Sequence, residues 1–131
     1  MDKFDTITLA KYRLNTAKEN LQTAHINFDN GMYKGSVNRA YYTIFHSLRA
    51  VLALDEKDFK KHSAIIAYFN QNYVKTKRFP EIHNIIDKAS LVRNSSDYDD
   101  FYIVSKEEAK EQINNAEYIL ELVHKYIEDI K

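Results

Sequence analysis

The sequence contains no cysteine, and it has only two glycines and one proline in 131 residues. The lack of cysteine excludes disulfides, thiolate metal sites and a cysteine nucleophile, and it suits a reducing compartment. Because glycine and proline are the main breakers of regular structure, their scarcity favours long helices. Gly31 and Gly35 cannot alone form a phosphate-binding loop, and no Gly-x-Ser-x-Gly motif is present, which excludes P-loop and serine-hydrolase chemistry.

The chain also lacks an excess of either charge and a long apolar run. Its 19 basic residues balance 19 acidic ones, so no overall field draws it to nucleic acid or to a membrane, and anion binding has to be local. No segment approaches the ~18 apolar residues of a membrane span, and residues 1–6 lack the basic and apolar regions of a secretion signal. We therefore expect a cytoplasmic protein with a single domain over residues 1–131 and no membrane contact.

The five histidines do not have the spacing of a metal site. No two of them share a helix face with a neighbouring carboxylate, which is the arrangement typical of zinc ligands. We therefore expect no metal ion and no other cofactor. His62 lies beside the expected start of a helix at Ser63, and it is interpreted as a capping or loop-fixing residue.

Apolar residues recur at alternating intervals of three and four along most of the chain, which predicts an all-α fold. One stripe covers residues 7–28 and ends before Gly31. Another covers residues 109–130 and follows a capping box at residues 105–108. Stripes of this period favour neighbouring helices that cross at about 20°, so these two helices are expected to pack together.

Three more helices are predicted between these stripes. The first covers residues 36–53, the second begins at Ser63, and the third runs from Pro80 to near Arg93. Residues 94–100 are rich in asparagine, serine and aspartate, which are typical of turns. This segment is therefore interpreted as an ordered loop that neighbouring aromatic residues hold in place.

The helix predicted over residues 36–53 carries a polar stripe on an otherwise apolar segment. Four residues, separated by three, four and three positions, share one face of it: Arg39, Tyr42, His46 and Arg49. Burying arginine and histidine without partners is costly. The stripe therefore either meets acidic partners inside the fold, with the aspartates of segment 94–100 as candidates, or lines a groove that is open to an anionic ligand.

A set of short motifs extends along nearly the whole chain. They are Arg39-Ala40-Tyr41-Tyr42-x-x-Phe45-His46-x-x-Arg49-Ala50, Lys61-His62, Phe69, Tyr73-Val74 and Leu91-x-Arg93-x-x-x-Asp97-Tyr98-Asp99-Asp100-Phe101. Together they resemble the HEPN superfamily, and within it small stand-alone bacterial and archaeal proteins with a paired-tyrosine helix and an Arg-x-x-x-Asp-Tyr loop. The resemblance implies an up-and-down bundle of four main helices with a short extra helix. It also implies a homodimer whose cleft holds RNA or nucleotide.

Catalytic members of this superfamily share an Arg-polar-x-x-x-His motif and cleave RNA without a metal ion, often as toxins paired with a minimal nucleotidyltransferase antitoxin. Arg93 and Asn94 match the start of the motif, but Tyr98 occupies the histidine position. Tyrosine, with a pKa of about 10, is a poor base for a ribose 2′-hydroxyl, and the acidic pair at 99–100 would raise its pKa further. His46, on the arginine-lined face, is the alternative base.

The resemblance leaves three functions open. The first is binding of RNA or nucleotide by a protein with a degenerate ribonuclease motif, and the second is an active metal-independent endoribonuclease toxin. The third is a non-catalytic docking module for a nucleotidyltransferase, with Tyr98 as a target for nucleotide attachment. The candidate catalytic residues are Arg93, Tyr98 and His46, and the candidate ligand-binding residues are Arg39, Tyr42, Arg49, Asn94 and Asp97.

Overall fold

The structure, a computed structural model, describes residues 2–130 and is built from helices. No strand occurs in this range, which confirms the predicted all-α fold. The described elements are α1 (Lys3–Asp29), α2 (Tyr33–Leu54), α3 (His62–Phe69), the π-helical turn η1 (Asn70–Val74), α4 (His83–Tyr98) and α5 (Lys106–Glu128). None of these described helices has the length and apolar character needed to cross a membrane.

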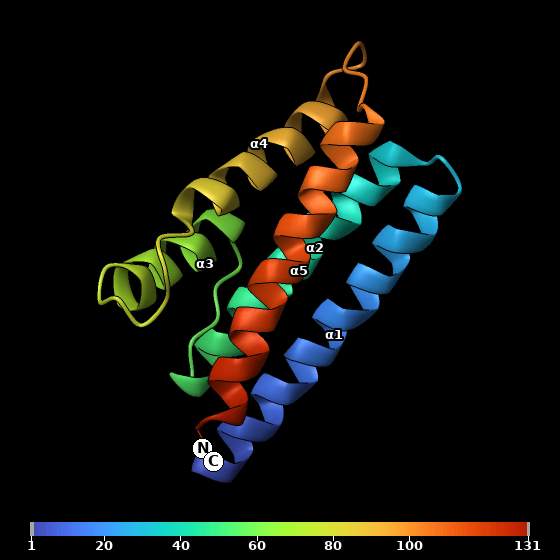
Figure 1. Ribbon diagram of the computed structural model, residues 1–131. Coiled ribbons are helices and arrows are strands. Elements are labelled where there is room, and N and C mark those ends of the chain that lie inside the picture. The colour runs from blue at the N-terminus through green and yellow to red at the C-terminus, as the bar shows by residue number, and fades with distance from the viewer. Residues whose placement is uncertain (1, 131) are drawn as a thin grey trace.

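The helices form an up-and-down bundle in which α2 contacts each of the other helices (Figure 1). α1, α2 and α5 run side by side along the molecule, while α3 and α4 pack on the side of α2 away from α1. The contact between α1 and α5 confirms that the two long apolar stripes belong to neighbouring helices. The connection from α4 to α5 projects beyond the bundle at one end.

Small residues bring α1 close to α2. Ala17 and Ala24 on α1 are fully buried, and the hydroxyl of Ser36 on α2 donates to the Ala24 carbonyl at 2.9 Å. A side-chain carbon added at Gly35 would lie 2.9 Å from the side-chain amide nitrogen of Asn27, so glycine allows α1 and α2 to approach closely here. These contacts fix the rotation of α2 about its axis and thereby the direction of its polar stripe.

Side-chain caps define the starts of α1 and α5. Asp2 accepts a hydrogen bond from the Asp5 amide, and Ser105 accepts one from the Glu108 amide, each at 3.0 Å. Glu108 does not complete the predicted capping box, because its carboxylate accepts from the Tyr102 hydroxyl at 2.7 Å. This hydrogen bond is the main cause that raises the pKa of Tyr102 to about 12.

Helix α4 differs from its predicted bounds. It begins at His83 and continues through Tyr98, whereas the sequence indicated a helix from Pro80 to near Arg93. The interpretation of residues 94–98 as part of a loop is therefore wrong.

Tertiary contacts outweigh the low helix propensity of this segment. Ser96 is buried in the bundle, and Asp97 accepts a hydrogen bond from Asn38 of α2 at 3.3 Å. Within α4, Arg93 and Asp97, one turn apart, also form an ion pair at 3.1 Å. The helical extension is what puts Arg93 and Asp97 on one face of α4.

Helix α3 continues directly into η1, a wider helical turn. The amide of Lys75 donates to the Asn70 carbonyl at 2.9 Å, a spacing of five residues that defines a π-turn. Tyr73 in this turn is buried, and its hydroxyl donates to the Asp55 carboxylate at 2.6 Å. Burial and this hydrogen bond raise the pKa of Tyr73. Because Asp55 is the C-terminal cap of α2, the bond anchors η1 to that helix.

Candidate functional site

Arg93 on α4 is the centre of a polar cluster that reaches α2. One of its Nη atoms donates to the Tyr42 hydroxyl at 3.2 Å. Its guanidinium carbon lies 5.1 Å from the centre of the Tyr41 ring and 5.5 Å from that of the Tyr42 ring. These distances are those of cation–π contacts, so the paired tyrosines of the sequence motif form a support for the guanidinium.

Acidic and amide groups hold other sides of Arg93. Its Nε lies 3.1 Å from the Asp97 carboxylate, as an ion pair that is not aligned as a hydrogen bond, and an Nη atom donates to Asn94 Oδ1 at 3.4 Å. Asn38 on α2 donates to the same Asp97 carboxylate at 3.3 Å. Because the Arg93 side chain is still 17% exposed, part of its edge faces solvent.

His62 also belongs to this cluster, although the sequence did not indicate it as a site residue. Its Nδ1 lies 3.0 Å from the Tyr41 hydroxyl, and its ring centre lies 4.0 Å from that of Phe45. Burial lowers the pKa of His62 below the ordinary histidine value, and the positive charges of Arg93 and Arg49 lower it further. The imidazole is therefore neutral near pH 7.

An open pocket of about 450 Å³ connects these groups between α2, α3 and α4. Its polar lining consists of Tyr41, His62, Ser63, Asp87, Ser90, Arg93 and Asn94. Small-molecule sites in proteins have volumes of about 300–1,000 Å³. The pocket thus has room for a nucleotide-sized group, and it combines a fixed cation with a neutral imidazole.

His46, the predicted alternative base, reaches Arg93 only through another residue. Its ring stacks on that of Tyr42, with centres 6.0 Å apart, and Tyr42 in turn binds Arg93. An Nη atom of Arg49 lies 3.4 Å from His46 Nδ1; since arginine can only donate, Nδ1 is the acceptor and Nε2 carries the proton. Burial lowers the pKa of His46, as does the positive charge of Arg49, so this imidazole is also neutral near pH 7.

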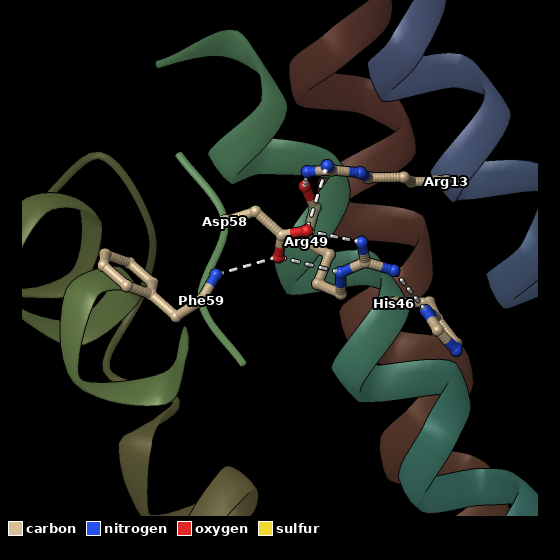
Figure 2. A network of polar contacts seen from close by, with 5 residues as sticks. All are labelled: Arg13, His46, Arg49, Asp58 and Phe59. Carbon is tan, nitrogen blue, oxygen red and sulfur yellow. Dashed lines mark hydrogen bonds and ion pairs between the residues drawn. The ribbon is translucent and has the colours of Figure 1, made fainter. Parts of the chain in front are cut away.

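A second polar network lies further along α2 (Figure 2). Arg49 donates to both carboxylate oxygens of Asp58, at 3.2 and 2.9 Å. Arg13 on α1 donates to the Arg49 carbonyl at 2.9 Å and lies 3.5 Å from the same carboxylate. The hydrogen bond from Arg49 lowers the pKa of Asp58, and burial lowers that of Arg13. Through this network the loop after α2 is held against both α1 and α2.

The polar stripe of α2 does not pair with the acidic residues near the end of α4, so that predicted role of its arginines is wrong. Arg49 binds Asp58, and Arg39 is exposed and donates to Asn20 of α1 at 3.1 Å. The two arginines miss these acidic residues because of where they lie along α2. The α4 cluster meets the stripe at Tyr42, about two turns before Arg49, whereas Arg39 points toward α1.

Tyr98 lies on a different face of α4 from Arg93. The two residues are five positions apart, which is about 140° around an α-helix. The Tyr98 side chain is 77% exposed, and the loop that follows also exposes Phe101 and Ile103, which are 92% and 88% accessible. Within one chain, Tyr98 is therefore not part of the Arg93 cluster.

The fold thus brings together only some of the residues that the sequence indicated. Tyr42, Arg93, Asn94 and Asp97 are in contact, and His46 adjoins them, while Arg39, Arg49 and Tyr98 lie outside the cluster. The Lys61-His62 motif drew attention to His62 in the sequence. Its place in the site, however, depends on how α3 packs against Tyr41. Within residues 2–130, no group of histidine and acidic side chains is arranged to hold a metal ion.

Comparison with known proteins agrees with the motifs and the fold. A UPF0332 protein of Thermotoga maritima is 32% identical over 124 residues, which is 94% of each chain. A protein of Methanocaldococcus jannaschii named "Putative toxin MJ0605" is 36% identical over 115 residues, 87% of this chain and 85% of its own. A second protein of that organism, named "Putative toxin MJ0142", is 29% identical over 112 residues, 85% of this chain and 76% of its own. The family model of the HEPN domain matches residues 10–126, a range that contains the helical bundle and the whole Arg93 cluster, and the chain therefore belongs to the HEPN family.

Proposed function

We propose that this protein binds RNA or a nucleotide through the cluster around Arg93, in the cleft of a homodimer. The observation that carries the proposal is the placement of Arg93. Its guanidinium rests on two tyrosine rings, is oriented by Asp97, and borders a pocket of about 450 Å³ that also contains His62. Guanidinium groups suit phosphate because they donate paired hydrogen bonds to its oxygens. A phosphate on the open edge of Arg93 would leave the attached nucleoside at the pocket.

The side chains around Arg93 have different roles in the proposed binding. Tyr41 is 3% exposed, so it supports Arg93 and His62 and offers little surface for a base to stack on. Asn94 is exposed beside the guanidinium and can donate to a ligand from its amide. Because the net charge of the chain is zero, long-range attraction is weak, and binding is expected to be modest and sensitive to salt.

Titration of a labelled single-stranded RNA, followed by fluorescence anisotropy, tests the binding proposal. Arg93→Ala is expected to weaken binding at least tenfold, since a hydrogen bond to a charged group contributes about 1.5–3 kcal/mol. It should also flatten the dependence of affinity on salt. Arg78→Ala is the matched control, because it removes an exposed arginine from the turn before α4. Equal affinities of the two variants would count against the proposal.

The end of α4 and the loop after it supply the proposed dimer surface. Four large apolar or aromatic side chains there are between 66% and 92% exposed: Leu91, Tyr98, Phe101 and Ile103. Exposed apolar groups that gather in one region mark interaction sites in soluble proteins. Pairing of two copies through this end would cover these side chains and bring both Tyr98 residues to the interface.

Metal-independent cleavage of RNA, with the protein acting as a toxin, is the second candidate function. Two relatives have toxin designations in their names, and the pocket combines Arg93 with an imidazole that is neutral near pH 7. Cleavage through the ribose 2′-hydroxyl needs a base for that proton and a cation beside the phosphate. Digestion of total cellular RNA in EDTA, beside an Arg93→Ala preparation, tests this function. Equal cleavage by both samples would indicate a contaminating nuclease.

A minimal nucleotidyltransferase is the proposed protein partner, by analogy with the toxin–antitoxin pairs of the family. In a single copy of the chain Tyr98 is 77% exposed, so its hydroxyl is accessible to a modifying enzyme before two copies pair. Co-expression with a nucleotidyltransferase gene from the same locus should add the mass of a nucleotide to the peptide that contains Tyr98. An unmodified peptide in mass spectrometry would reject this partnership in its catalytic form.

A further inference from the structure

His62 is a polar group of the pocket that the binding proposal leaves without a role. It is the first residue of α3, and it lines the pocket together with Arg93 and Asn94. Two contacts fix its ring: Nδ1 lies 3.0 Å from the Tyr41 hydroxyl, and the ring centre lies 4.0 Å from that of Phe45. With Nδ1 engaged by Tyr41, Nε2 on the opposite edge of the ring is the nitrogen that remains for a ligand.

We infer that His62 is the general base for RNA cleavage in this protein, and that Tyr41 is the residue that positions it. The inference rests on the proposed ribonuclease function and assigns a residue to its proton-transfer step. The sequence suggested Tyr98 or His46 for this step. Tyr98 lies on another face of α4, and His46 reaches Arg93 only through Tyr42.

The hydrogen bond between Tyr41 and His62 permits the tautomer that a base requires. The Tyr41 hydroxyl lies 3.0 Å from Nδ1 of His62, and a phenol hydroxyl can accept as well as donate. When Tyr41 accepts from the Nδ1–H of His62, a free lone pair remains on Nε2. His46 is in the opposite state, because Arg49 donates to its Nδ1 and Nε2 then carries the proton.

The charges around His62 keep it in the basic form at neutral pH. Burial lowers the pKa of His62, and Arg93 on α4 and Arg49 on α2 act in the same direction. Asp87 on α4 is the acidic residue of the pocket wall, and it is exposed to solvent. His46 on α2 is neutral near pH 7. The rate should therefore be constant near pH 7 and fall as the pH drops below the ordinary histidine value of about 6.5.

The proposed step balances without a further reactant except water. Nε2 of His62 takes the proton of the ribose 2′-hydroxyl, and the freed oxygen attacks the adjacent phosphorus while Arg93 binds the phosphate oxygens. The bond from phosphorus to the 5′-oxygen breaks, and this oxygen takes a proton from water. The imidazolium then gives its proton to the resulting hydroxide. The products are a 2′,3′-cyclic phosphate and a 5′-hydroxyl end.

The test is the pH–rate profile of a single-stranded RNA substrate in EDTA, measured for the parent and five variants. Asparagine in His62→Asn can keep a hydrogen bond to Tyr41 but cannot titrate, so kcat is expected to fall about 100- to 10,000-fold, with KM within threefold of the parent. The acidic limb of the profile should disappear, and added imidazole should restore part of the rate to His62→Ala. Tyr41→Phe should lower kcat but keep the acidic limb. His83→Asn, outside the pocket, should behave as the parent.

Three outcomes would overturn the inference. The first is that His62→Asn keeps both its rate and its acidic limb, or that these are lost in His46→Asn instead. The second is that the parent binds RNA through Arg93 but does not cleave it, which would leave the binding proposal standing. The third is that the parent neither binds nor cleaves RNA, in which case the proposed function fails as well. NMR of the parent provides a check that needs no variant, because adenosine 3′-phosphate should shift the imidazole signals of His62 more than those of His46.

Discussion

Replacing Asp97 with asparagine is expected to strengthen RNA binding, although it removes a charged residue from the proposed site. The Asp97 carboxylate lies 3.1 Å from Nε of Arg93 and neutralises part of its charge. Asparagine has nearly the same shape, and its Oδ1 can still accept from Arg93 or from Asn38, which now donates to Asp97 at 3.3 Å. The substitution should therefore keep the direction of Arg93 while it removes a negative charge that repels phosphate.

The size of this effect follows from the geometry. A phosphate on the open edge of the guanidinium would lie about 7 Å from the Asp97 carboxylate, where two like charges repel by about 0.6–1.2 kcal/mol for effective dielectric constants of about 80 to 40. Removing this repulsion corresponds to a gain in affinity of about three- to sevenfold. The ion pair itself is partly exposed, with side chains 17% and 26% accessible, so its loss should reduce the free energy of unfolding by no more than about 1 kcal/mol.

The assay is fluorescence anisotropy of a labelled single-stranded RNA at low salt, where the electrostatic difference is largest. Glu121→Gln controls for the change in net charge, because Glu121 is exposed on α5. This control should bind as the parent does. If Asp97→Asn binds RNA no more tightly than the parent while it remains folded, the phosphate does not lie at Arg93 in the way we describe.

Three further predictions concern stability and assembly. Asp58→Asn is expected to lower the free energy of unfolding by about 1 kcal/mol near pH 7, since a carboxylate that is 45% exposed loses two guanidinium partners. Because the folded-state pKa of Asp58 is lowered, this stabilisation is complete above the unfolded value of about 4 and disappears as the pH falls through the folded value. Urea curves of parent and variant should therefore converge in acid, and a constant difference would contradict the ion pair. Leu48→Ala, at a fully buried position, should cost about 3–5 kcal/mol in urea denaturation, and a cost below about 1 kcal/mol would contradict the packing around α2. Phe101→Asp should convert the proposed dimer to a monomer in sedimentation equilibrium, whereas Tyr12→Asp, at another exposed aromatic, should not. Equal masses of the two variants would refute the proposed dimer surface.

The long helices could be predicted because their signal is local and repeated. A helix that buries one face shows the same apolar spacing at every turn, and α1 and α5 have this spacing over their whole length. The end of α4 lacks such a signal. Its serine, asparagine and aspartate residues favour turns, whereas contacts that the local sequence does not reveal, among them the hydrogen bond from Asn38 of α2 to Asp97, support the helix.

The candidate site was visible in the sequence only where its residues share a helix face. Tyr42 and His46 could be grouped by their spacing on α2, and Arg93 could be singled out by its motif. His62 is part of the Lys61-His62 motif, but its place in the site could not be predicted. The reason is that 21 residues separate it from Tyr41 and nothing local indicates that α3 turns back onto α2 at that point. The partner of Arg49 was missed for the same reason, since Asp58 lies in the loop beyond the end of α2.

The π-helical turn η1 determines how His62, at the start of α3, is rotated about the helix axis relative to Tyr73. Its five-residue hydrogen bond accommodates one residue more than an α-helical turn would. If one residue were deleted between Asn70 and Val74, a regular helix could form, but with Tyr73 still held by Asp55 it would rotate His62 by about 100°. The imidazole would then leave Tyr41 although no residue of the pocket had changed. The same rotation would turn the buried side chains of Ile65 and Phe69 away from the core, so a deletion in η1 would disturb the packing of α3 and the position of His62 together.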